Sequence, residues 1–243
     1  MDTGEKLLDP VEEAVSHISA GRVLDVATGT GGFINFLAEN LMDYTQIIGI
    51  DTVEHRLATA RQAYPLANIR FMRMDAARMS FTDGHFDTVC IANSLHHMLH
   101  LEGVLAEMLR VCKLGGHIII SEMFRDDQSE TQLTHVYLHH WWAAVDTLQG
   151  IIQFETFTRE HILEIWRKLG LHNCAQFEVK DLDVDPQDPE LLNELDTIID
   201  RYIQHTIDQS SGADLRLRGE ELRKRVHHVG FHAATTLFLI GEK

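Results

Sequence analysis

The residues best suited to chemistry lie in a glycine-rich segment, DVATGTGG, at positions 25–32. The segment follows a short apolar run and precedes helical spacing, so the pattern predicts a strand-to-helix turn. Small residues at such a turn let the backbone approach a ligand closely, and the helix N-terminus presents free N–H groups. Asp51 ends the next predicted strand about 20 residues on, where a carboxylate accepts hydrogen bonds from ribose hydroxyls in sheets of this kind. We therefore expect a site for a ribose-containing ligand at this edge of the sheet.

The spacing of the glycines separates two classes of nucleotide-binding turn. The dinucleotide fingerprint is GxGxxG, and counting from Gly29 gives Gly31 and then Ile34, so the third glycine is missing. In register with DxGxGxG, the segment instead supplies Asp25, an alanine in place of the first glycine, and then the two glycines. This pattern resembles motif I of the class I S-adenosylmethionine-dependent methyltransferases. A nicotinamide oxidoreductase remains an alternative that Ile34 disfavours.

Three further segments resemble motifs of the same family, in the usual order and at the usual spacing. GIDT at 49–52 is similar to the second motif, and residues 74–98 are similar to the next two motifs of the branch related to ubiquinone and menaquinone C-methylation. LRVCKLGGHIIISE at 109–122 is similar to the family's helix, turn and fifth strand. The resemblance is strong over residues 20–123 and rests on topology alone over 157–184 and 234–242.

The resemblance implies S-adenosylmethionine as the cofactor and gives the motif residues their roles. Gly29 and Gly31 would make room for its carboxypropyl end. Asp25 would hold its ammonium group through a charge-assisted contact. Asp51 would bind the ribose, and Asp75 the adenine amino group. The full set of implied cofactor-binding residues is Asp25, Ala27, Thr28, Gly29, Thr30, Gly31, Asp51, Thr52, Asp75, Ala76 and Asn93.

A pair of histidines, His96 and His97, follows the fourth predicted strand. Ligands of open α/β folds bind at this edge of the sheet. We predict both as candidate catalytic residues, because an imidazole that titrates near neutrality can act as general base for an O–H or N–H acceptor. The family often carries a histidine pair here, and a role in stabilising the fold or facing solvent is an equal alternative.

Two further histidine pairs have the spacing of one helical turn. His135 and His139 lie on a predicted helix, and His228 and His232 repeat the spacing before the last predicted strand. Imidazoles that converge from two insertions would suit a transition metal such as zinc or iron, so these four are the predicted metal ligands. The alternative is that they are surface and lid histidines of an acidic protein. Further ligands could come from Glu122, His117 or Cys174.

The same predicted helix and the segment after it are rich in aromatic residues. One hypothesis is that they form the wall of a pocket for a planar or cationic acceptor. The other, which we favour, is that they pack the helix against the sheet. The aromatic residues concerned are Tyr137, Trp141, Trp142 and Phe154.

Strands that alternate with helices predict a doubly wound, Rossmann-like α/β sheet. We expect seven strands, mostly parallel, with an antiparallel last strand as in the family. The predicted strands are 22–27, 46–51, 69–75, 86–93, 117–123, 175–184 and 234–242. The predicted helices are 7–18, 33–41, 52–64, 101–112, 130–149, 157–171, 186–207 and 217–228. One domain over 1–243 would have its core at 20–123, 157–184 and 233–243 and two lid-like helical insertions at 124–156 and 185–232.

The composition and charge of the chain disfavour several classes of binding partner. The chain of 243 residues has 21 basic and 37 acidic side chains and a formal charge of −16, which disfavours nucleic acid and anionic membranes. No apolar run approaches the roughly 20 residues of a membrane helix, and the N-terminus lacks a signal-peptide pattern. Three cysteines without CxxC spacing favour a reducing compartment. We therefore expect a cytoplasmic location.

Together these patterns predict methyl transfer from S-adenosylmethionine to a small-molecule acceptor that the two insertions enclose. The accepting atom, whether carbon, nitrogen, oxygen or sulfur, stays open. One alternative keeps the cofactor but uses a bound metal to activate the acceptor. Another is a non-catalytic cofactor-binding subunit whose insertions bind a protein partner, and the second insertion would equally suit the arm of a homodimer.

Overall fold

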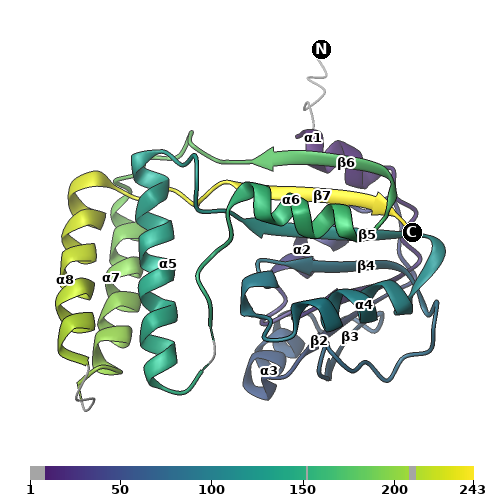
Figure 1. Cartoon of the computed structure of the whole chain (residues 1–243), viewed down its shortest axis with the longest axis horizontal. Coiled ribbons are helices and arrows are strands. Elements are labelled where there is room, and N and C mark those ends of the chain that lie inside the picture. The colour runs from purple at the N-terminus through teal and green to yellow at the C-terminus, as the bar shows by residue number, and fades with distance from the viewer. Residues whose placement is uncertain (1–8, 152, 208–211) are drawn as a thin grey trace.

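The fold is known from a computed structural model, which describes residues 9–151, 153–207 and 212–243 (Figure 1). Its strands are β1 (Arg22–Val26), β2 (Gln46–Asp51), β3 (Ile69–Arg73), β4 (Phe86–Ala92), β5 (Cys112–Met123), β6 (His172–Val179) and β7 (Thr236–Glu242). They form one sheet in the order β3-β2-β1-β4-β5-β7-β6. β7 runs antiparallel to both of its neighbours, and the other pairs are parallel. The predicted seven-stranded, mostly parallel sheet with an antiparallel last strand is confirmed.

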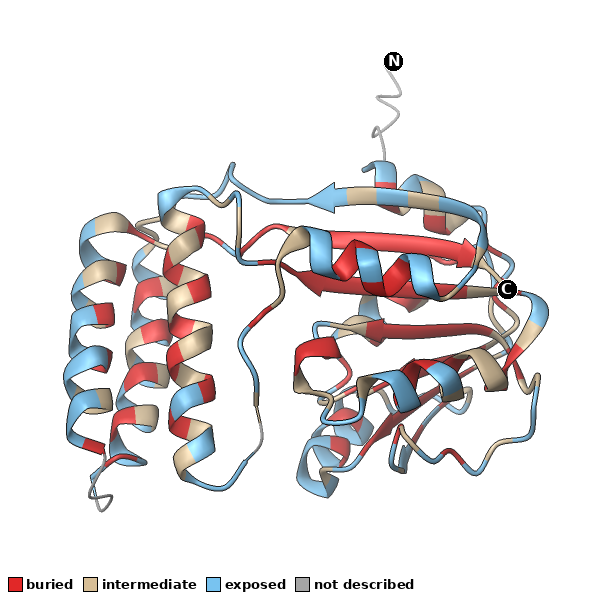
Figure 2. Ribbon diagram, in the orientation of Figure 1, coloured by how far each residue is buried: buried red, intermediate tan, exposed pale blue. Residues whose placement is uncertain are grey.

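Helices cover both faces of the sheet. Successive residues of a strand point to opposite faces, so Leu24 packs in a cluster with α4 and α6, whereas Val23 packs in a second cluster with α1, α2 and α3. Figure 2 shows the consequence: β5 and β7 are buried along most of their length, while the edge strand β6 is largely exposed. The elements concerned are α1 (Pro10–Ser16), α2 (Gly32–Asn40), α3 (Glu54–Ala63), α4 (Leu101–Val111) and α6 (Arg159–Lys168), with a short 3₁₀ helix, η1 (Leu95–His97).

Three more helices stand side by side at one end of the sheet (Figure 1). They are α5 (Glu130–Leu148), α7 (Pro189–Gln204) and α8 (Gly212–Val229). Apolar residues of all three form a separate buried cluster, with Leu138 from α5, Ile199 from α7 and Leu222 from α8 among them. α5 follows the carboxyl end of β5, and α7 follows that of β6. The two predicted insertions therefore lie at the ligand-binding edge of the sheet.

Several predicted boundaries need correction. β5 begins at Cys112, five residues before the predicted start at 117, because the LGG segment lies within the strand. The predicted helix 52–64 begins later, at Glu54, and Val53 holds its N-cap position without a side-chain hydrogen bond. At the start of α6, the Thr158 hydroxyl caps the helix by accepting a hydrogen bond from the backbone of His161. Residues 7 and 8 of the first predicted helix lie outside the described residues.

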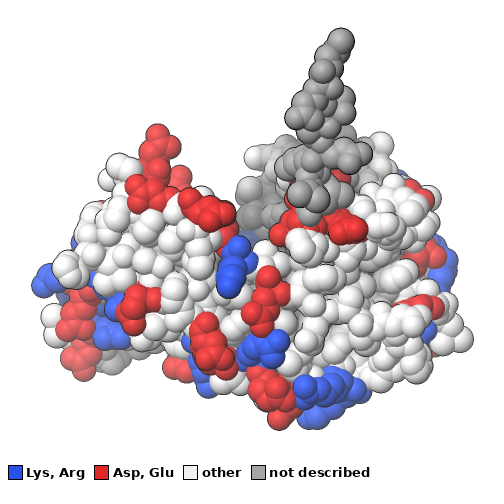
Figure 3. All heavy atoms as spheres, turned by 90° about the horizontal axis from the view of Figure 1, so that it is seen from above, with Lys and Arg blue, Asp and Glu red and all other residues white. Residues whose placement is uncertain are grey.

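The surface agrees with an acidic protein. Figure 3 shows acidic and basic side chains interspersed on one face, with no continuous basic region on that face. Among the described residues, none of the helices is both long and apolar enough to span a bilayer.

Substituting alanine for glycine in two of the helices should have opposite effects on stability. A Cβ at Gly219 of α8 would lie 2.4 Å from the Trp141 ring of α5, whereas one at Gly103 of α4 would meet nothing within 4 Å. Gly219→Ala should lower the free energy of unfolding by about 1–3 kcal/mol through overpacking. Gly103→Ala should raise it by up to about 1 kcal/mol, because alanine favours a helix. Urea unfolding measures both, and a stabilised Gly219→Ala protein would contradict the close α5–α8 packing.

Candidate functional site

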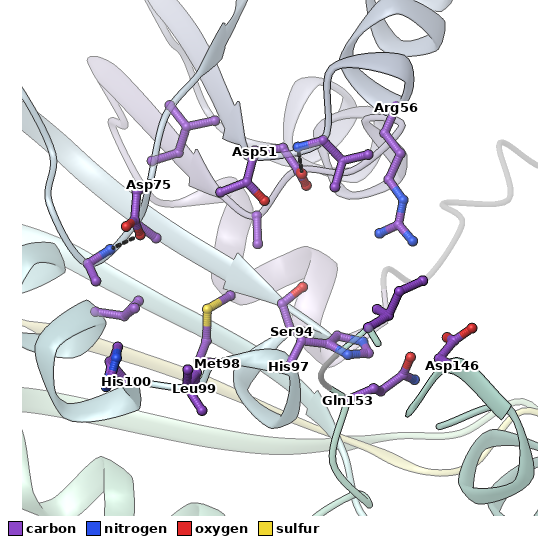
Figure 4. A pocket seen from close by; sticks show the side chains of 18 of the residues that line it. Asp51, Arg56, Asp75, Ser94, His97, Met98, Leu99, His100, Asp146 and Gln153 are labelled. Atoms are coloured by element: carbon purple, nitrogen blue, oxygen red, sulfur yellow. Dashed lines mark hydrogen bonds between the residues drawn. The ribbon is translucent and has the colours of Figure 1, made fainter. Parts of the chain in front are cut away.

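A cavity of about 680 Å³ lies where the parallel strands end. Its sheet side is formed by residues at or just after the carboxyl ends of β2, β3 and β4, including Asp51, Asp75 and Ser94. Its other side is formed by α5 and α7. Figure 4 shows Asp51, Asp75 and Arg56 bordering the cavity from one side and His97, Gln153 and Asp146 from the other. The cavity therefore lies between the sheet edge and the three-helix layer.

The glycine-rich turn brings backbone close to this edge. Ala27, Gly29 and Gly31 all have positive φ angles, of 55°, 55° and 89°, a conformation that glycine adopts without steric cost. A Cβ at Gly29 would meet nothing within 4 Å, whereas one at Gly31 would lie 2.7 Å from the Tyr64 ring. Gly31 is thus required by packing, and Gly29 leaves open space beside the turn.

Asp51 fastens the turn to the start of α3. One of its carboxylate oxygens accepts a hydrogen bond from the Gly29 N–H at 2.9 Å, and the other accepts one from the Val53 N–H at 2.8 Å. An ionised carboxylate can accept about four hydrogen bonds. Two acceptor positions therefore remain for hydroxyl groups of a ligand in the cavity.

Asp25 lies beneath the turn and is fully buried. Its carboxylate accepts a hydrogen bond from the Thr28 hydroxyl at 2.5 Å. The pKa of Asp25 is raised from 3.8 to about 7, because burial and, to a smaller extent, the nearby Asp51 charge raise it more than the Thr28 hydrogen bond lowers it. The Asp25 side chain therefore changes its charge near neutral pH.

The structure places only part of the predicted cofactor-binding set on the cavity. Asp75 lies there with one carboxylate oxygen bound to the Ala77 N–H at 2.9 Å. Asn93 instead accepts a hydrogen bond from the Met123 backbone at 3.1 Å. The predicted residues on the cavity wall are Ala27, Asp51, Thr52, Asp75 and Ala76. Those outside the wall are Asp25, Thr28, Gly29, Thr30, Gly31 and Asn93.

His96 and His97 have different surroundings. His96 is buried, and its Nδ1 donates a hydrogen bond to Glu122 Oε1 at 2.6 Å. The other oxygen of Glu122 accepts a hydrogen bond from the Leu95 N–H at 2.8 Å. His97 borders the cavity together with His139. Of the two predicted bases, His97 is therefore the one that a ligand in this cavity would meet.

The histidines beside the cavity are held uncharged. Burial, together with repulsion from His96 and Arg56, lowers the pKa of His97 to about 3. Burial and the neighbouring histidines lower the pKa of His139 to about 2. Both rings therefore present a lone pair at neutral pH.

The four predicted metal ligands do not converge, so this prediction is wrong as a set. His135 accepts a hydrogen bond from the Ala234 N–H at 2.9 Å. Both ring nitrogens of His232 are engaged, with the Thr131 hydroxyl at 2.8 Å and the Val184 carbonyl at 3.0 Å. His228 is exposed. In the described part of the chain, the cluster with metal-binding spacing is instead His96, His97 and His139.

The aromatic residues of the α5 region divide between two roles. Trp142 borders the cavity, whereas Trp141 is buried and donates its indole N–H to the Leu215 carbonyl at 2.8 Å. Tyr137 lies under the Arg225 guanidinium at 5.1 Å, and Phe154 is largely exposed. Packing thus explains most of the set, and one tryptophan forms part of a pocket wall.

Sequence reasoning missed several polar residues of the cavity, among them Arg56, Asp146 and Tyr202. Tyr202 of α7 donates a hydrogen bond to Asp146 at 3.5 Å, and burial raises the pKa of that carboxyl. The signal for Asp146 is its spacing, since it lies one turn beyond Trp142 and two beyond His139 on the same helix face. Tyr202 gave no such signal, because it reaches the cavity from a separate helix.

Comparison with known proteins finds a similar family for the part of the chain that forms most of the first five strands of the sheet. A sequence model described as a methyltransferase domain matches residues 24–120, which run from β1 into β5. Residues 24–120 are thus similar to this family. The matched segment contains the glycine-rich turn, Asp51, Asp75 and the histidine pair.

Curated relatives share this methyltransferase domain. Over 111 residues, the chain is 35% identical to a demethylmenaquinone methyltransferase of Bacteroides fragilis. This alignment covers 44% of this chain and 45% of that protein. Over 113 residues, the chain is 35% identical to the ubiquinone/menaquinone biosynthesis C-methyltransferase UbiE of Pseudomonas fluorescens, covering 44% of each. The match spans less than half the length of these relatives. The predicted resemblance to this branch of methyltransferases is confirmed over the matched segment.

Solved structures show the fold over nearly the whole chain. YcgJ of Bacillus subtilis is similar with a TM-score of 0.58 at 16% identity, covering 96% of both chains. The [4+2]-cyclase SpnF is similar with a TM-score of 0.59 at 19% identity, covering 96% of this chain and 79% of that one. A Haemonchus contortus phosphoethanolamine N-methyltransferase, in complex with phosphomonomethylethanolamine and S-adenosylhomocysteine, gives 0.55 at 17% identity over 96% and 52%. The predicted fold class is confirmed.

Proposed function

We propose that this protein transfers the methyl group of S-adenosylmethionine to a small-molecule acceptor bound between the sheet edge and the three-helix layer. The observation that carries the proposal is the cavity itself. Its sheet wall holds the two motif acids, Asp51 and Asp75, and its helical wall holds His139, Trp142 and Tyr202. Its volume of about 680 Å³ falls within the range of about 300–1,000 Å³ for small-molecule sites.

The sheet wall fits the nucleoside part of S-adenosylmethionine. Asp51 keeps two acceptor positions for the ribose hydroxyls, and Asp75 presents a carboxylate for the adenine amino group. The open space beside Gly29 suits the amino-acid end, and Asp25 in its ionised form would attract the ammonium group. When bound, the cofactor supplies an electrophilic methyl group, which an electron pair of the acceptor (a lone pair of a heteroatom or the π pair of an electron-rich carbon) attacks as the carbon–sulfur bond breaks and its electron pair returns to sulfur.

The helical wall would orient the acceptor and exclude water. Trp142 and Tyr202 offer flat apolar surfaces, with ring centroids 5.8 Å apart. The Trp142 Nε1 is buried without a hydrogen-bond partner among the described residues, so an acceptor oxygen could satisfy it. In the metal-free protein, His97 contributes a neutral ring that would accept a hydrogen bond from an acceptor O–H or N–H. Its lowered pKa makes it an orienting group first and a weak proton acceptor second.

The proposal also gives the domain its organisation. The sheet with its flanking helices would be the cofactor-binding core, over residues 20–123, 157–184 and 233–243. The segments 124–156 and 185–232 would supply the acceptor wall. The names of the curated relatives make demethylmenaquinone and ubiquinone precursors the first acceptors to test.

Calorimetric titration should test the cofactor half of the proposal. We expect S-adenosylmethionine and S-adenosylhomocysteine to bind competitively at one site per chain, and NADH not to displace them. Glu54→Ala should bind as the unmodified protein does, because Glu54 is an exposed partner of Arg61 just beyond the site. Turnover is then measured with methyl-labelled cofactor and a series of demethylated quinols, phenols and amines. Displacement by NADH, or binding without label transfer to any acceptor class, would contradict the proposal.

A further inference from the structure

We infer that His96, His97 and His139 form a binding site for one transition-metal ion, Zn²⁺ or Fe²⁺, in the wall of the cavity. Each histidine places a ring nitrogen within 4.8 Å of the others. Two of the rings come from η1, directly after β4, and the third comes from the middle of α5. The site thus connects the sheet edge to the three-helix layer.

The spacing of two ring nitrogens matches that of two ligands on one ion. His96 Nε2 and His139 Nε2 lie 3.3 Å apart. Zinc binds histidine nitrogen at about 2.0–2.1 Å with tetrahedral angles, which places two ligand nitrogens about 3.4 Å from each other. An ion between these two rings would therefore require little movement of either one.

Glu122 orients the His96 ring so that it can act as a metal ligand. The Glu122 carboxylate accepts the Nδ1 proton of His96, so Nε2, which lies 3.3 Å from His139 Nε2, is the ring nitrogen available to an ion. Both side chains are fully buried, and the second carboxylate oxygen is anchored to the Leu95 N–H. A carboxylate that orients a histidine in this way is the usual partner of a metal-binding imidazole.

The neighbouring histidines outside the cluster form hydrogen bonds with other groups of the protein. These contacts distinguish them from the three histidines of the cluster. His140 binds the Thr156 hydroxyl at 2.9 Å, and His135 and His232 have the backbone and hydroxyl partners described above. By contrast, His139 Nδ1 is buried without a partner among the described residues. The Nε2 of His139 is within hydrogen-bond distance of His96 Nε2, at 3.3 Å, so the contact that the described residues give to the His139 ring nitrogens is with another member of the cluster.

Three protein ligands leave coordination positions open, as in catalytic zinc sites. His97 and His139 border the cavity while His96 lies behind them, so the open side would face the cavity. If the proposed methyl transfer is correct, the ion would bind an acceptor through an anionic oxygen, such as a phenolate or enolate. It would then act as a Lewis acid that keeps the acceptor deprotonated. The binding of the ion itself does not depend on that function.

The test is a titration of the full-length, untagged protein with Co²⁺, followed by visible absorption, and with Zn²⁺ in competition with a chromogenic chelator. We expect one ion per chain and Co²⁺ bands of four- or five-coordinate geometry. His97→Ala and His139→Ala should weaken binding by more than about 100-fold, since losing an orienting partner alone costs about 10–100-fold. Glu122→Gln should weaken metal binding by about 10–100-fold, because it removes only the orienting partner of His96. His228→Ala and His135→Gln are the matched controls and should bind as the unmodified protein does.

The affinity of every variant for S-adenosylhomocysteine is measured in parallel, which reports an intact sheet edge. Unchanged metal binding in His97→Ala and His139→Ala would overturn the inference, as would loss of binding in His228→Ala, which would show an adventitious surface site. The absence of stoichiometric binding to the unmodified protein would overturn it as well. Metal binding without cofactor binding would contradict the proposed function alone, and cofactor binding without metal binding would contradict this inference alone.

Discussion

Replacing Asp25 by asparagine should make the cofactor-free protein more stable at neutral and alkaline pH. The carboxylate is fully buried, and its pKa rises from 3.8 to about 7. The folded state therefore binds a proton between these two values that the unfolded chain has released, so stability falls as the pH rises through this window. At 1.36 kcal/mol per pKa unit, the ionised form costs about 4 kcal/mol above pH 7. Asparagine removes this cost and still accepts the Thr28 hydroxyl hydrogen bond.

Urea unfolding at several pH values measures the effect as a difference between variant and unmodified protein. The difference should grow by about 1.4 kcal/mol per pH unit between pH 5 and 7 and level off above pH 7. Thr28→Val is the companion variant, because it removes the hydroxyl that favours the ionised form. A difference that does not change with pH would show that Asp25 stays ionised throughout. The stabilised Asp25→Asn protein should nevertheless bind S-adenosylmethionine about 1.5–3 kcal/mol more weakly, because it loses the charged partner of the ammonium group.

Asp51→Ala should weaken binding of S-adenosylhomocysteine by about 1–3 kcal/mol, roughly 5- to 150-fold, as expected for lost hydrogen bonds to a charged group. Two causes add together. The ribose hydroxyls lose their acceptor, and the N–H groups of Gly29 and Val53 lose the carboxylate that fastens the turn to α3.

Asp51→Asn separates the two causes. Its one remaining oxygen can accept from either N–H group, but its amide then presents a donor where the second acceptor stood. Its affinity should therefore fall between those of the alanine variant and the unmodified protein. Calorimetry with S-adenosylhomocysteine is the measurement, and Glu54→Ala, an exposed acid on the following turn, is the control. Equal affinity of Asp51→Ala and unmodified protein would remove Asp51 from the site.

The sequence was sufficient for the parts of the fold that depend on local patterns. The apolar runs at 46–51 and 86–93 predicted β2 and β4 to within one residue, because buried parallel strands have to be apolar on both faces. The position of Asp51 followed from the same reasoning, since the residue that ends a strand must lie at the sheet edge. β5 was predicted too short because glycines usually interrupt a strand, whereas here Gly115 and Gly116 lie within it.

Local sequence patterns could not predict the cluster of His96, His97 and His139. Helical spacing correctly put His135 and His139 on one side of α5, but it could not say which residues that side would meet. His232 was removed from the predicted site by contacts with Thr131, 101 residues away, and Val184, 48 residues away. The register of β4 and β5, in which Ala92 pairs with Ser121, brings Glu122 close to His96. That register is a tertiary property which no single segment encodes.

The helical wall and the sheet wall of the cavity belong to separately packed parts of the protein. The buried cluster of α5, α7 and α8 shares no residue with the clusters on the two faces of the sheet. One small apolar cluster, formed by Met123, Val136 and Ala234, lies where α5 meets the end of β5 and the segment before β7. A compound that touches both walls of the cavity would then hold these two parts of the protein together. Affinity for that compound and cohesion of the protein would be thermodynamically linked, so each substrate would tighten the enclosure in which it reacts.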